Sequence, residues 1–307
     1  MPFNMYDVAI VGSGPAGYSA GIYSCRYQLK TVVFGKMIGG TISKVHKICN
    51  YPGFYEISGM DLSNNMYEQA SKTGCNMKFE SVKNIEKVDD HFKLTTDLDR
   101  EYEAKTVILT VGTERTKLAI PDEDKFIGKG LSYCATCDAN FYKDKVVGVI
   151  GGSSAATMAT TMLSELASKV YIIYRGKELR GDPAWKKQVL NKDNVEVLYQ
   201  TVVVGLQGDE KLESLKLNKE YKDSNILPVE GLFVEIGSEP NKNLAQKIGV
   251  ETTKKGYIVV DQAQQTSVEG IWAAGDCTTN SNNFRQVVTA VAEGGVAANS
   301  VYQYLNH

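Results

Sequence analysis

Two cysteines separated by two residues, Cys134 and Cys137, form the pattern with the clearest chemistry in this 307-residue sequence. Thiols at this spacing can reach disulfide geometry in the first turn of a helix. A helix N-terminus stabilises thiolate, so it lowers the pKa of such a thiol and makes the pair reactive at neutral pH. Asp138 follows directly and is close enough to exchange a proton with the thiols, or it serves only as a first-turn acid favoured by the helix dipole.

A zinc site and a pair of unrelated core cysteines are the alternatives for these residues. Zinc requires further ligands, but the three histidines (His46, His91 and His307) form no spaced pair and no second Cys-x-x-Cys exists. We therefore expect no metal site and favour a redox disulfide. The remaining cysteines are expected to behave as small buried apolar residues: Cys25, Cys49, Cys75 and Cys277.

The composition is that of an ordinary globular protein. With 34 basic and 36 acidic side chains the net charge is -2, which shows no basic excess for nucleic acid or anionic lipid. No uncharged apolar run approaches the ~20 residues of a membrane span, and no signal peptide is visible. We therefore expect a cytoplasmic, reducing compartment, in which structural disulfides are rare and a close cysteine pair is more often redox-active.

The elements that must position these residues come as two similar halves. Residues 7–11 and 146–150 are short apolar runs that end in small-residue turns, and a helix-compatible stretch follows each. A second β-rich run comes next in both halves, at residues 31–34 and 170–174. This βαβ order, found twice, predicts two parallel-sheet units, in agreement with about two domains for a chain of this length.

Two stretches suggest how the halves are joined, and a third suggests a hairpin. Residues 112–121 and 237–242 are punctuated by Gly and Pro and are the candidate crossings between domains. Residues 209–228 are polar and charged, which is typical of a hairpin or an exposed meander.

The first turn, residues 12–17, reads Gly-Ser-Gly-Pro-Ala-Gly and matches a dinucleotide-binding fingerprint. Its first glycine permits the tight turn, its second lets the backbone approach a pyrophosphate, and its third allows the helix to pack closely on the strand. Within a complete βαβ unit, dinucleotide binding is favoured over a packing turn without ligand. The acid that usually ends the second strand is absent, because the strand ends Phe34-Gly35-Lys36. Other groups must therefore hold the adenosine half.

The C-terminal region carries a third motif. Residues 270–277 are an apolar strand that ends in Gly275-Asp276, and the small residues of 284–295 favour a close-packed helix. Asp276 alone could be a cap or turn residue. Together with the first turn, it looks like a contact to the ribityl chain of a flavin.

In this order, the motifs resemble the low-molecular-weight thioredoxin reductases, a class II family of FAD-dependent pyridine-nucleotide-disulfide oxidoreductases. The resemblance covers essentially the whole chain. Cys-Ala-Thr-Cys inside the second nucleotide-binding domain distinguishes this family from glutathione-reductase-like relatives. The resemblance is carried by the first turn, Asn50-Tyr51-Pro52-Gly53, Thr110-Val111-Gly112-Thr113, Cys134-Ala135-Thr136-Cys137-Asp138, Gly275-Asp276 and Arg285-Gln286.

The resemblance implies an α/β fold with two Rossmann-like dinucleotide-binding domains of the three-layer ββα type, the second inserted in the first. Residues 1–115 and 246–307 would form a discontinuous FAD-binding domain. Residues 116–245 would form the inserted redox-disulfide domain, which is similar to an NADPH-binding domain. The family also implies a homodimer and thioredoxin as the substrate.

FAD would be held by residues from both ends of the chain. The glycines of the first turn would meet its pyrophosphate, Asn50 the flavin side and Asp276 the ribityl chain. Arg285 and Gln286 would open a helix whose positive end points at the flavin ring, and Thr41 stands where relatives often have Gln. The implied set is Gly12, Gly14, Pro15, Ala16, Gly17, Gly40, Thr41, Asn50, Gly112, Gly275, Asp276, Arg285, Gln286 and Val287.

The family mechanism assigns a role to each residue of the cysteine motif. A donor reduces FAD, and two electrons then pass to the disulfide. Cys137 would face the flavin, and Cys134 would be the thiolate that attacks thioredoxin after a domain rotation. Asp138 would act as acid and base on the thiols.

The inserted domain departs from the family's NADPH motifs in two places. In its turn, Ser153 replaces the glycine that admits the pyrophosphate, and the added Cβ obstructs close approach. In its arginine cluster, Arg175 and Arg180 persist but Gly176 removes one guanidinium. That loss costs ~1.5–3 kcal/mol, on the order of ten- to a hundredfold in affinity. The remnant of an NADPH site would comprise Gly151, Ser153, Ala156, Arg175 and Arg180.

The chain thus resembles family members with degraded NADPH motifs, such as the ferredoxin-dependent flavin thioredoxin reductases. The electron donor stays open among NADPH, NADH, reduced ferredoxin and a deazaflavin. Arg175 replaces the acid that NAD would want, and two losses at opposite ends of one cofactor favour ferredoxin slightly over NADPH. Ferredoxins are acidic and would dock near the flavin edge against basic residues such as Lys44, Lys47 or Lys129. A redox sensor without turnover, or an inactive partner in a heteromer, is the alternative of another class, and the intact cysteine motif argues against inactivity.

Overall fold

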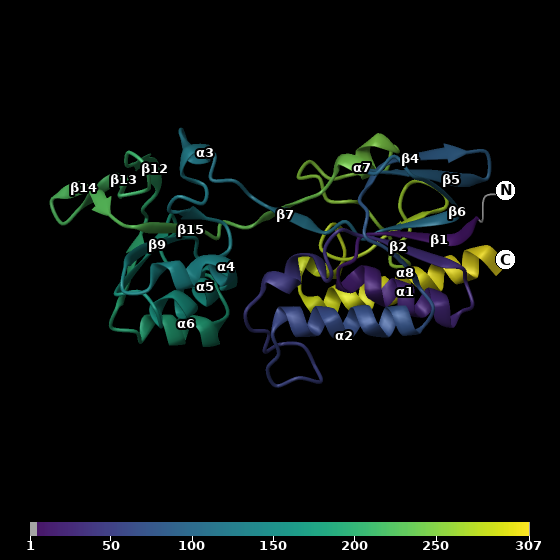
Figure 1. The fold of residues 1–307 in the computed structure, drawn as a ribbon, viewed down its shortest axis with the longest axis horizontal. Coiled ribbons are helices and arrows are strands. Elements are labelled where there is room, and N and C mark those ends of the chain that lie inside the picture. The colour runs from purple at the N-terminus through teal and green to yellow at the C-terminus, as the bar shows by residue number, and fades with distance from the viewer. Residues whose placement is uncertain (1–4, 307) are drawn as a thin grey trace. The chain divides into compact units, whose positions relative to one another are not determined.

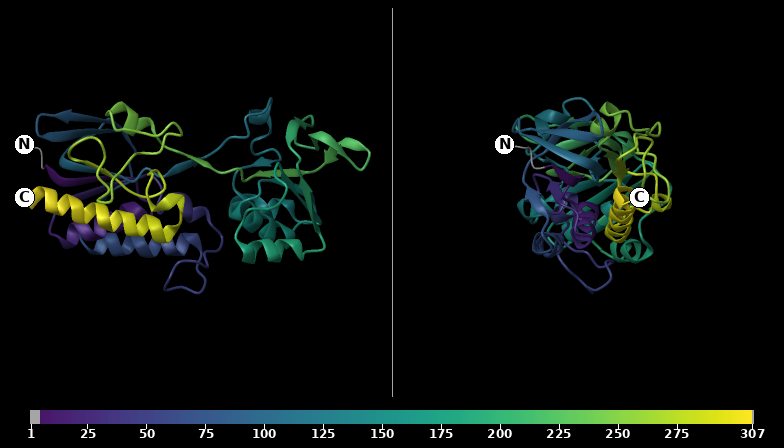
Figure 2. Two further views of the ribbon diagram at one scale, coloured as in Figure 1. Left: turned by 180° about the vertical axis from the view of Figure 1, so that it is seen from behind. Right: turned by 90° about the vertical axis from the view of Figure 1, so that its right-hand side faces the viewer.

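The computed structural model describes residues 5–306, which form two compact units (Figures 1 and 2). Unit 1 comprises the chain up to Glu114 and from Glu239 onward, and unit 2 comprises Arg115–Ser238. The chain passes between them through two short strands that pair with each other, β7 (Thr113–Arg115) and β16 (Ser238–Pro240). Both crossings lie within the stretches that the sequence marks with Gly and Pro.

The inserted unit ends earlier than the family resemblance implies. Residues 239–245 belong to unit 1, whereas the expected inserted segment runs to residue 245. The physical reason is α7 (Asn243–Lys247), a short helix that buries Ala245 completely in the core of unit 1.

Unit 1 is built on a parallel sheet in the order β3-β2-β1-β6, with β17 beside the C-terminal half of β6. The N-terminal half of β6 pairs with β5, and β4 follows, so that these three strands form an antiparallel layer. One strand thus belongs to both layers. The bounds are β1 Tyr6–Val11, β2 Thr31–Phe34, β3 Asn76–Lys78, β4 Val82–Val88, β5 His91–Thr96, β6 Glu101–Leu109 and β17 Ile271–Ala273.

Three helices form the third layer of unit 1: α1 (Pro15–Arg26), α2 (Gly59–Lys72) and α8 (Val287–Asn306). They lie together on one face of the parallel sheet (Figure 1). A Cβ at Gly294 would lie 2.1 Å from the backbone oxygen of Ala16, so small residues bring α8 against α1, as the sequence predicts. The 3-10 turns η1 (Gly40–Lys44) and η3 (Ser281–Asn283) complete the unit.

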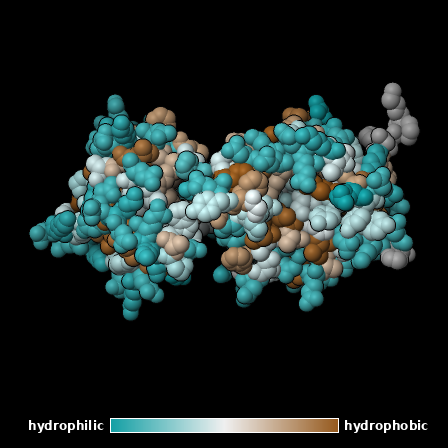
Figure 3. Space-filling model, turned by 90° about the horizontal axis from the view of Figure 1, so that it is seen from below, coloured by the Kyte–Doolittle hydropathy of each residue, from teal (hydrophilic) through white to brown (hydrophobic). Residues whose placement is uncertain are grey.

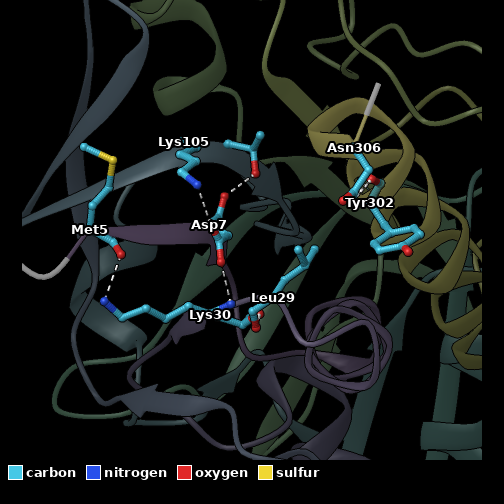
Figure 4. Close-up of polar contacts among 9 residues, drawn as sticks. Met5, Asp7, Leu29, Lys30, Lys105, Tyr302 and Asn306 are labelled. Carbon is cyan, nitrogen blue, oxygen red and sulfur yellow. Dashed lines mark hydrogen bonds and ion pairs between the residues drawn. The ribbon is translucent and has the colours of Figure 1, made fainter.

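Polar contacts fix the start of β1 beside its neighbours (Figure 4). The Asp7 carboxylate accepts a hydrogen bond from the Lys30 backbone N–H at 2.9 Å and pairs with Lys105 Nζ at 2.8 Å. Lys30 Nζ donates to the Met5 carbonyl at 2.8 Å. Burial acts to raise the pKa of Asp7, but the contacts with Lys105 and Lys30 outweigh it and hold that pKa below its ordinary value. β1 therefore enters the sheet with its polar groups satisfied.

Unit 2 repeats this design with a parallel sheet in the order β11-β10-β9-β15-β8 and an antiparallel sheet of β12, β13 and β14. β13 and β14 form a hairpin within residues 209–228, as predicted. The helices and 3-10 turn are α3 Glu123–Phe126, α4 Ala135–Asp138, η2 Ala139–Tyr142, α5 Ser154–Ser164 and α6 Pro183–Leu190. The strands are β8 Leu131–Ser132, β9 Val146–Ile150, β10 Lys169–Tyr174, β11 Val195–Tyr199, β12 Val203–Gln207, β13 Ser214–Tyr221, β14 Ser224–Pro228 and β15 Gly231–Val234.

The predicted α/β fold class, with two Rossmann-like units and the second inserted in the first, is confirmed. Within residues 5–306, no helix is both long and apolar enough to cross a membrane.

Candidate functional site

The turn after β1 packs two of its glycines against backbone and leaves the third beside open space. A Cβ at Gly12, where φ is +128°, would lie 2.1 Å from the Thr110 oxygen, and a Cβ at Gly17 would lie 1.9 Å from the Gly12 oxygen. A Cβ at Gly14 would meet only the Gly39 oxygen, at 3.9 Å. Gly12 and Gly17 therefore bring helix and strand together, and Gly14 leaves room for a ligand to reach the backbone.

A cavity of about 380 Å³ lies at this turn, entirely within unit 1. Most of the predicted FAD-binding residues line it, and they come from both segments of the discontinuous unit. Those that do are Gly12, Gly14, Pro15, Ala16, Gly40, Thr41, Gly112, Gly275, Asp276, Gln286 and Val287.

The three other predicted residues, Gly17, Asn50 and Arg285, are not among the residues that line the cavity. Gly17 acts through packing alone. Asn50 Nδ2 donates to Gln286 Oε1 at 2.9 Å, and Arg285 Nε donates to the Asp276 carbonyl at 3.2 Å. The guanidinium of Arg285 lies over the ring of Tyr257, 3.9 Å from its centroid. These contacts hold two cavity-lining residues in place.

Several lining residues were not predicted, among them Ser13, Lys36, Ser81, Thr110 and Glu114. Lys36 pairs with Asp97. A Cβ at Gly35 would lie 2.0 Å from the Ser13 hydroxyl oxygen, so the packing leaves no room for an acidic side chain at that position.

Glu293 was also missed, although it fixes the segment that carries Asp276. Its buried carboxylate accepts hydrogen bonds from Gly275 N at 2.7 Å, Thr278 Oγ1 at 3.1 Å and Ser281 Oγ at 2.5 Å. One signal was available in the sequence, because Glu293 is the only acidic residue in α8. Burial raises the pKa of Asp276 to about 6, with the charge of Glu293 adding to the effect and Arg285 opposing it.

The raised pKa of Asp276 predicts how the stability of the apoprotein depends on pH. The ordinary pKa is 3.8, so folding favours the protonated acid, and its contribution to stability is lost as pH rises from about 4 through about 6. The full effect is ~3 kcal/mol. We expect the thermal midpoint of Asp276→Asn apoprotein to fall less over this range than that of the unchanged chain. Parallel curves would contradict the prediction, and Asp209→Asn, at an exposed aspartate, is the control.

Cys134 and Cys137 form a disulfide in unit 2, with their Cα atoms 5.3 Å apart. Cys134 is half-buried and precedes the single turn of α4, whereas Cys137 is exposed. The Ser132 hydroxyl donates to Asp138 Oδ2 at 2.6 Å and accepts from the Cys134 backbone N–H at 3.0 Å. One buried hydroxyl, which the sequence did not reveal, therefore holds the acid beside the sulfur pair.

The expectation for the other cysteines is wrong for two of them. Cys75 and Cys277 are buried, but Cys25 is half-buried and Cys49 is exposed. Cys49 lies in a loop after η1, outside the helices and strands that form the core.

The turn after β9 has Ser153 at the position that corresponds to Gly14 in the first turn. Ser153 precedes α5 with φ −91° and ψ 179°, and Gly14 precedes α1 with φ −86° and ψ −174°. Because the backbones match, Ser153 carries a side chain where Gly14 leaves open space. Ser153 lines a second cavity, of about 390 Å³ and entirely within unit 2. Gly151, Arg175 and Arg180 line it too, whereas Ala156 is buried in the core.

Gly176 does not line this cavity, because it packs on Tyr174. A Cβ at Gly176 or at Gly152 would lie 2.5 Å from the Tyr174 ring, so an arginine at position 176 requires that ring to move. Glu235 lines the cavity and pairs with Arg115 at 2.9 Å. Burial raises the pKa of Glu235, while Arg115 opposes the change. An acid thus accompanies the two remaining arginines in this cavity.

The residues of the unit 1 cavity fit FAD. The start of α1 has no acidic side chain in its first turn and leaves Gly14 open, which suits a pyrophosphate. The Asp276 carboxylate can accept hydrogen bonds from the hydroxyls of a ribityl chain. The start of α8 also lines the cavity and presents the positive end of its dipole there.

Two dinucleotide-binding folds, one with a Cys-x-x-Cys disulfide, define a disulfide oxidoreductase. Residues 6–294 match the family described as pyridine nucleotide-disulphide oxidoreductase. The chain is 40% identical over 305 residues to the thioredoxin reductase of Treponema pallidum, covering 98% of this chain and 97% of that protein. It is 36% identical over 311 residues to that of Peptoclostridium litorale, covering 98% of each. The chain belongs to the thioredoxin reductase family, which implies FAD as its cofactor.

Solved structures agree with this assignment. A thioredoxin reductase from Lactococcus lactis matches with a TM-score of 0.92 and 31% identity, covering 98% of this chain and 99% of that one. A ferredoxin-flavin thioredoxin reductase from Clostridium acetobutylicum matches with a TM-score of 0.53 and 36% identity, covering 98% of each chain. The predicted resemblance is therefore confirmed, including its similarity to ferredoxin-dependent members.

Proposed function

We propose that this protein reduces thioredoxin with two electrons that pass through FAD and the Cys134–Cys137 disulfide. FAD would be held by the predicted residues of the unit 1 cavity and would serve as the two-electron carrier. The Cys134 thiolate attacks the disulfide of thioredoxin and forms a mixed disulfide. Cys137 then displaces thioredoxin as its dithiol and closes the enzyme's disulfide again. Asp138, held by Ser132, exchanges protons with the thiols.

Reduced ferredoxin is the electron donor that we favour, and the main observation behind this choice is the side chain of Ser153. Its side chain enters the unit 2 cavity at the position where Gly14 leaves space in unit 1. Gly176 supplies no guanidinium to this cavity, and the Glu235 carboxylate that lines it, although paired with Arg115, places an acid beside the two remaining arginines. The similarity to a ferredoxin-flavin thioredoxin reductase supports the same donor.

NADPH is the second candidate donor. The unit 2 cavity is open at about 390 Å³, and Arg175 and Arg180 line it. Two guanidinium groups are suitable partners for phosphate.

Anaerobic reduction of the flavin separates the donors. Purified FAD-loaded protein is mixed with reduced ferredoxin, NADPH, NADH or a reduced deazaflavin, and loss of the flavin absorbance is followed. We expect rapid bleaching with ferredoxin and slow or no bleaching with the pyridine nucleotides. Rapid bleaching by micromolar NADPH would establish the second candidate instead. Bleaching without thioredoxin turnover, for every donor, would favour the redox sensor.

Ser153→Gly is expected to improve NADPH binding about tenfold, the effect of ~1.4 kcal/mol. Removal of the side chain lets the pyrophosphate approach the backbone, as Gly14 does in unit 1. The dissociation constant is measured by titration with NADPH. Ser168→Gly, at an exposed serine of unit 2, serves as the control. An unchanged constant for Ser153→Gly would mean that this side chain does not limit binding.

Ferredoxin would dock close to the flavin cavity. Lys44 is exposed at the end of η1, whose residues Thr41 and Ile42 line the cavity. Lys47 is already paired with Glu56, and Lys129 is an exposed residue of unit 2. Lys44 is therefore the candidate that best fits an acidic partner, and Lys44→Glu should slow reduction by ferredoxin most at low salt.

We also propose that the protein is a homodimer, as its family resemblance implies. The helical face of unit 1 carries apolar patches, drawn brown in Figure 3. Exposed Tyr23, Met60, Val296 and Tyr302 belong to α1, α2 and α8. Light scattering should give about twice the chain mass of 33.7 kDa, and a single-chain mass would contradict this proposal.

A further inference from the structure

A second pair of cysteines lies within bonding reach in unit 1. Cys25 is in the last turn of α1, Cys75 directly precedes β3, and their sulfur atoms are 3.0 Å apart. A disulfide bond is ~2.05 Å long, so the sulfurs need to approach by only on the order of 1 Å. The proposed transfer of electrons to thioredoxin uses neither residue.

The two thiols differ in access and in acidity. Cys25 is half-buried, whereas Cys75 is 7% exposed. The hydrogen bond with Cys75 lowers the pKa of Cys25, while the same contact and burial raise the pKa of Cys75. Cys25 is therefore the thiol that reacts first, and Cys75, which stays protonated, is the neighbouring thiol that reacts second.

The backbone next to Cys75 has room to adjust. Gly74 has φ +101°, and a Cβ built there would meet no atom within 4 Å. The turn between α2 and β3 is thus exposed to open space on that side. A small movement of this turn can bring the sulfur of Cys75 to bonding distance while α1 stays in place.

We propose that Cys25 and Cys75 are a second redox pair, which a hydroperoxide converts to a disulfide. The Cys25 thiolate attacks one peroxide oxygen, the O–O bond breaks, and a sulfenic acid forms as hydroxide or alkoxide leaves. The sulfur of Cys75 then attacks the Cys25 sulfur, and the sulfenic hydroxyl leaves with the Cys75 proton as water. The two thiols together lose two electrons, and the peroxide gains them.

The new bond would connect α1 to the edge strand of the parallel sheet. It joins residues 50 positions apart in the chain. A cross-link over such a loop restricts the unfolded chain more than the folded one. Oxidation is therefore expected to raise the thermal midpoint of unit 1.

Peptide mapping of the FAD-loaded protein tests this pair. The protein is reduced with dithiothreitol, freed of reductant, treated with hydrogen peroxide, quenched in acid, alkylated after denaturation and digested. We expect a Cys25–Cys75 linked peptide that dithiothreitol releases. Exposed Cys49 should stay mostly alkylatable, because within residues 5–306 it is a free cysteine with no second sulfur recorded beside it. Full alkylation of Cys25 and Cys75, after the Cys134–Cys137 disulfide has reformed, would overturn the proposal.

Two variants test the order of the steps without relying on activity. In Cys75→Ser the Cys25 sulfenic acid has no resolving thiol, so the sulfenic acid reagent dimedone should label Cys25. No label at Cys25 in this variant would overturn its assignment as the reacting thiol. Cys49→Ser is the matched control and should form the linked peptide as the unchanged chain does.

Discussion

Replacing either cysteine of the redox disulfide with serine is expected to abolish thioredoxin reduction, with a loss of at least ~10³-fold in turnover. Cys134 and Cys137 form one disulfide, and neither can store two electrons without the other. Turnover is measured with a steady supply of reduced ferredoxin. Cys49→Ser changes an exposed cysteine outside the pair and should keep full activity.

The same variants separate the roles of the two sulfurs. In Cys137→Ser the attacking thiol remains, so a stable mixed disulfide between Cys134 and thioredoxin should accumulate. Cys134→Ser should form none. Cys137 is the more exposed of the two in unit 2, so trapping by each variant decides which sulfur attacks thioredoxin. A mixed disulfide in Cys134→Ser alone would exchange the roles, and normal turnover by either variant would remove the pair from the mechanism.

Gly12→Ala is expected to destabilise unit 1 severely, by at least ~3 kcal/mol. The new Cβ would lie 2.1 Å from the Thr110 oxygen, at a residue whose φ is +128°. Both the overlap and the left-handed backbone oppose the substitution. Thermal denaturation of the apoprotein measures the loss, and an unchanged midpoint would contradict the packing described for this turn.

Gly14→Ala, two residues along the same turn, is the matched control. Its Cβ would meet only the Gly39 oxygen at 3.9 Å, so the apoprotein should keep its stability. The methyl group would occupy space where the pyrophosphate must approach the backbone. We therefore expect weaker FAD binding from an intact fold, measured by titration of the apoprotein. Unchanged affinity would exclude Gly14 from the pyrophosphate site.

The parts of the fold that follow from local patterns were predictable. Residues 8–11 and 146–150 form the cores of β1 and β9 because both are continuous runs of β-branched and small apolar residues, which suit a strand buried in a parallel sheet. Most predicted FAD residues line one cavity, since their motifs lie at strand ends that meet at one edge of the sheet.

What could not be predicted depends on contacts between distant segments. Ser132 belongs to no local pattern, yet its hydroxyl fixes the Asp138 carboxylate. Glu293 stands out only as a lone acid in its helix, and its contact with the Gly275 N–H, next to Asp276, depends on the fold. Gly176 could be read from the sequence only as a lost arginine, whereas its packing on Tyr174 explains why a side chain is excluded there. The approach of Cys25 and Cys75 likewise arises from the packing of α1 beside α2 and the turn that follows it, which no spacing in the sequence indicates.

The pairing of β17 with β6 determines when unit 1 can be completed during synthesis. Unit 2 is one continuous segment, residues 115–238, so all of it leaves the ribosome before the C-terminal segment of unit 1 does. The lining of the unit 1 cavity includes residues between 274 and 290, and β17 pairs with β6 although the whole inserted unit separates them in the sequence. Domains generally fold as units during synthesis, so unit 2 can fold while unit 1 still lacks a strand and a wall of its cavity. The cavity for the cofactor therefore cannot be complete before the C-terminal segment is made, and a chain that stops early can carry both cysteines of the disulfide without a complete flavin site.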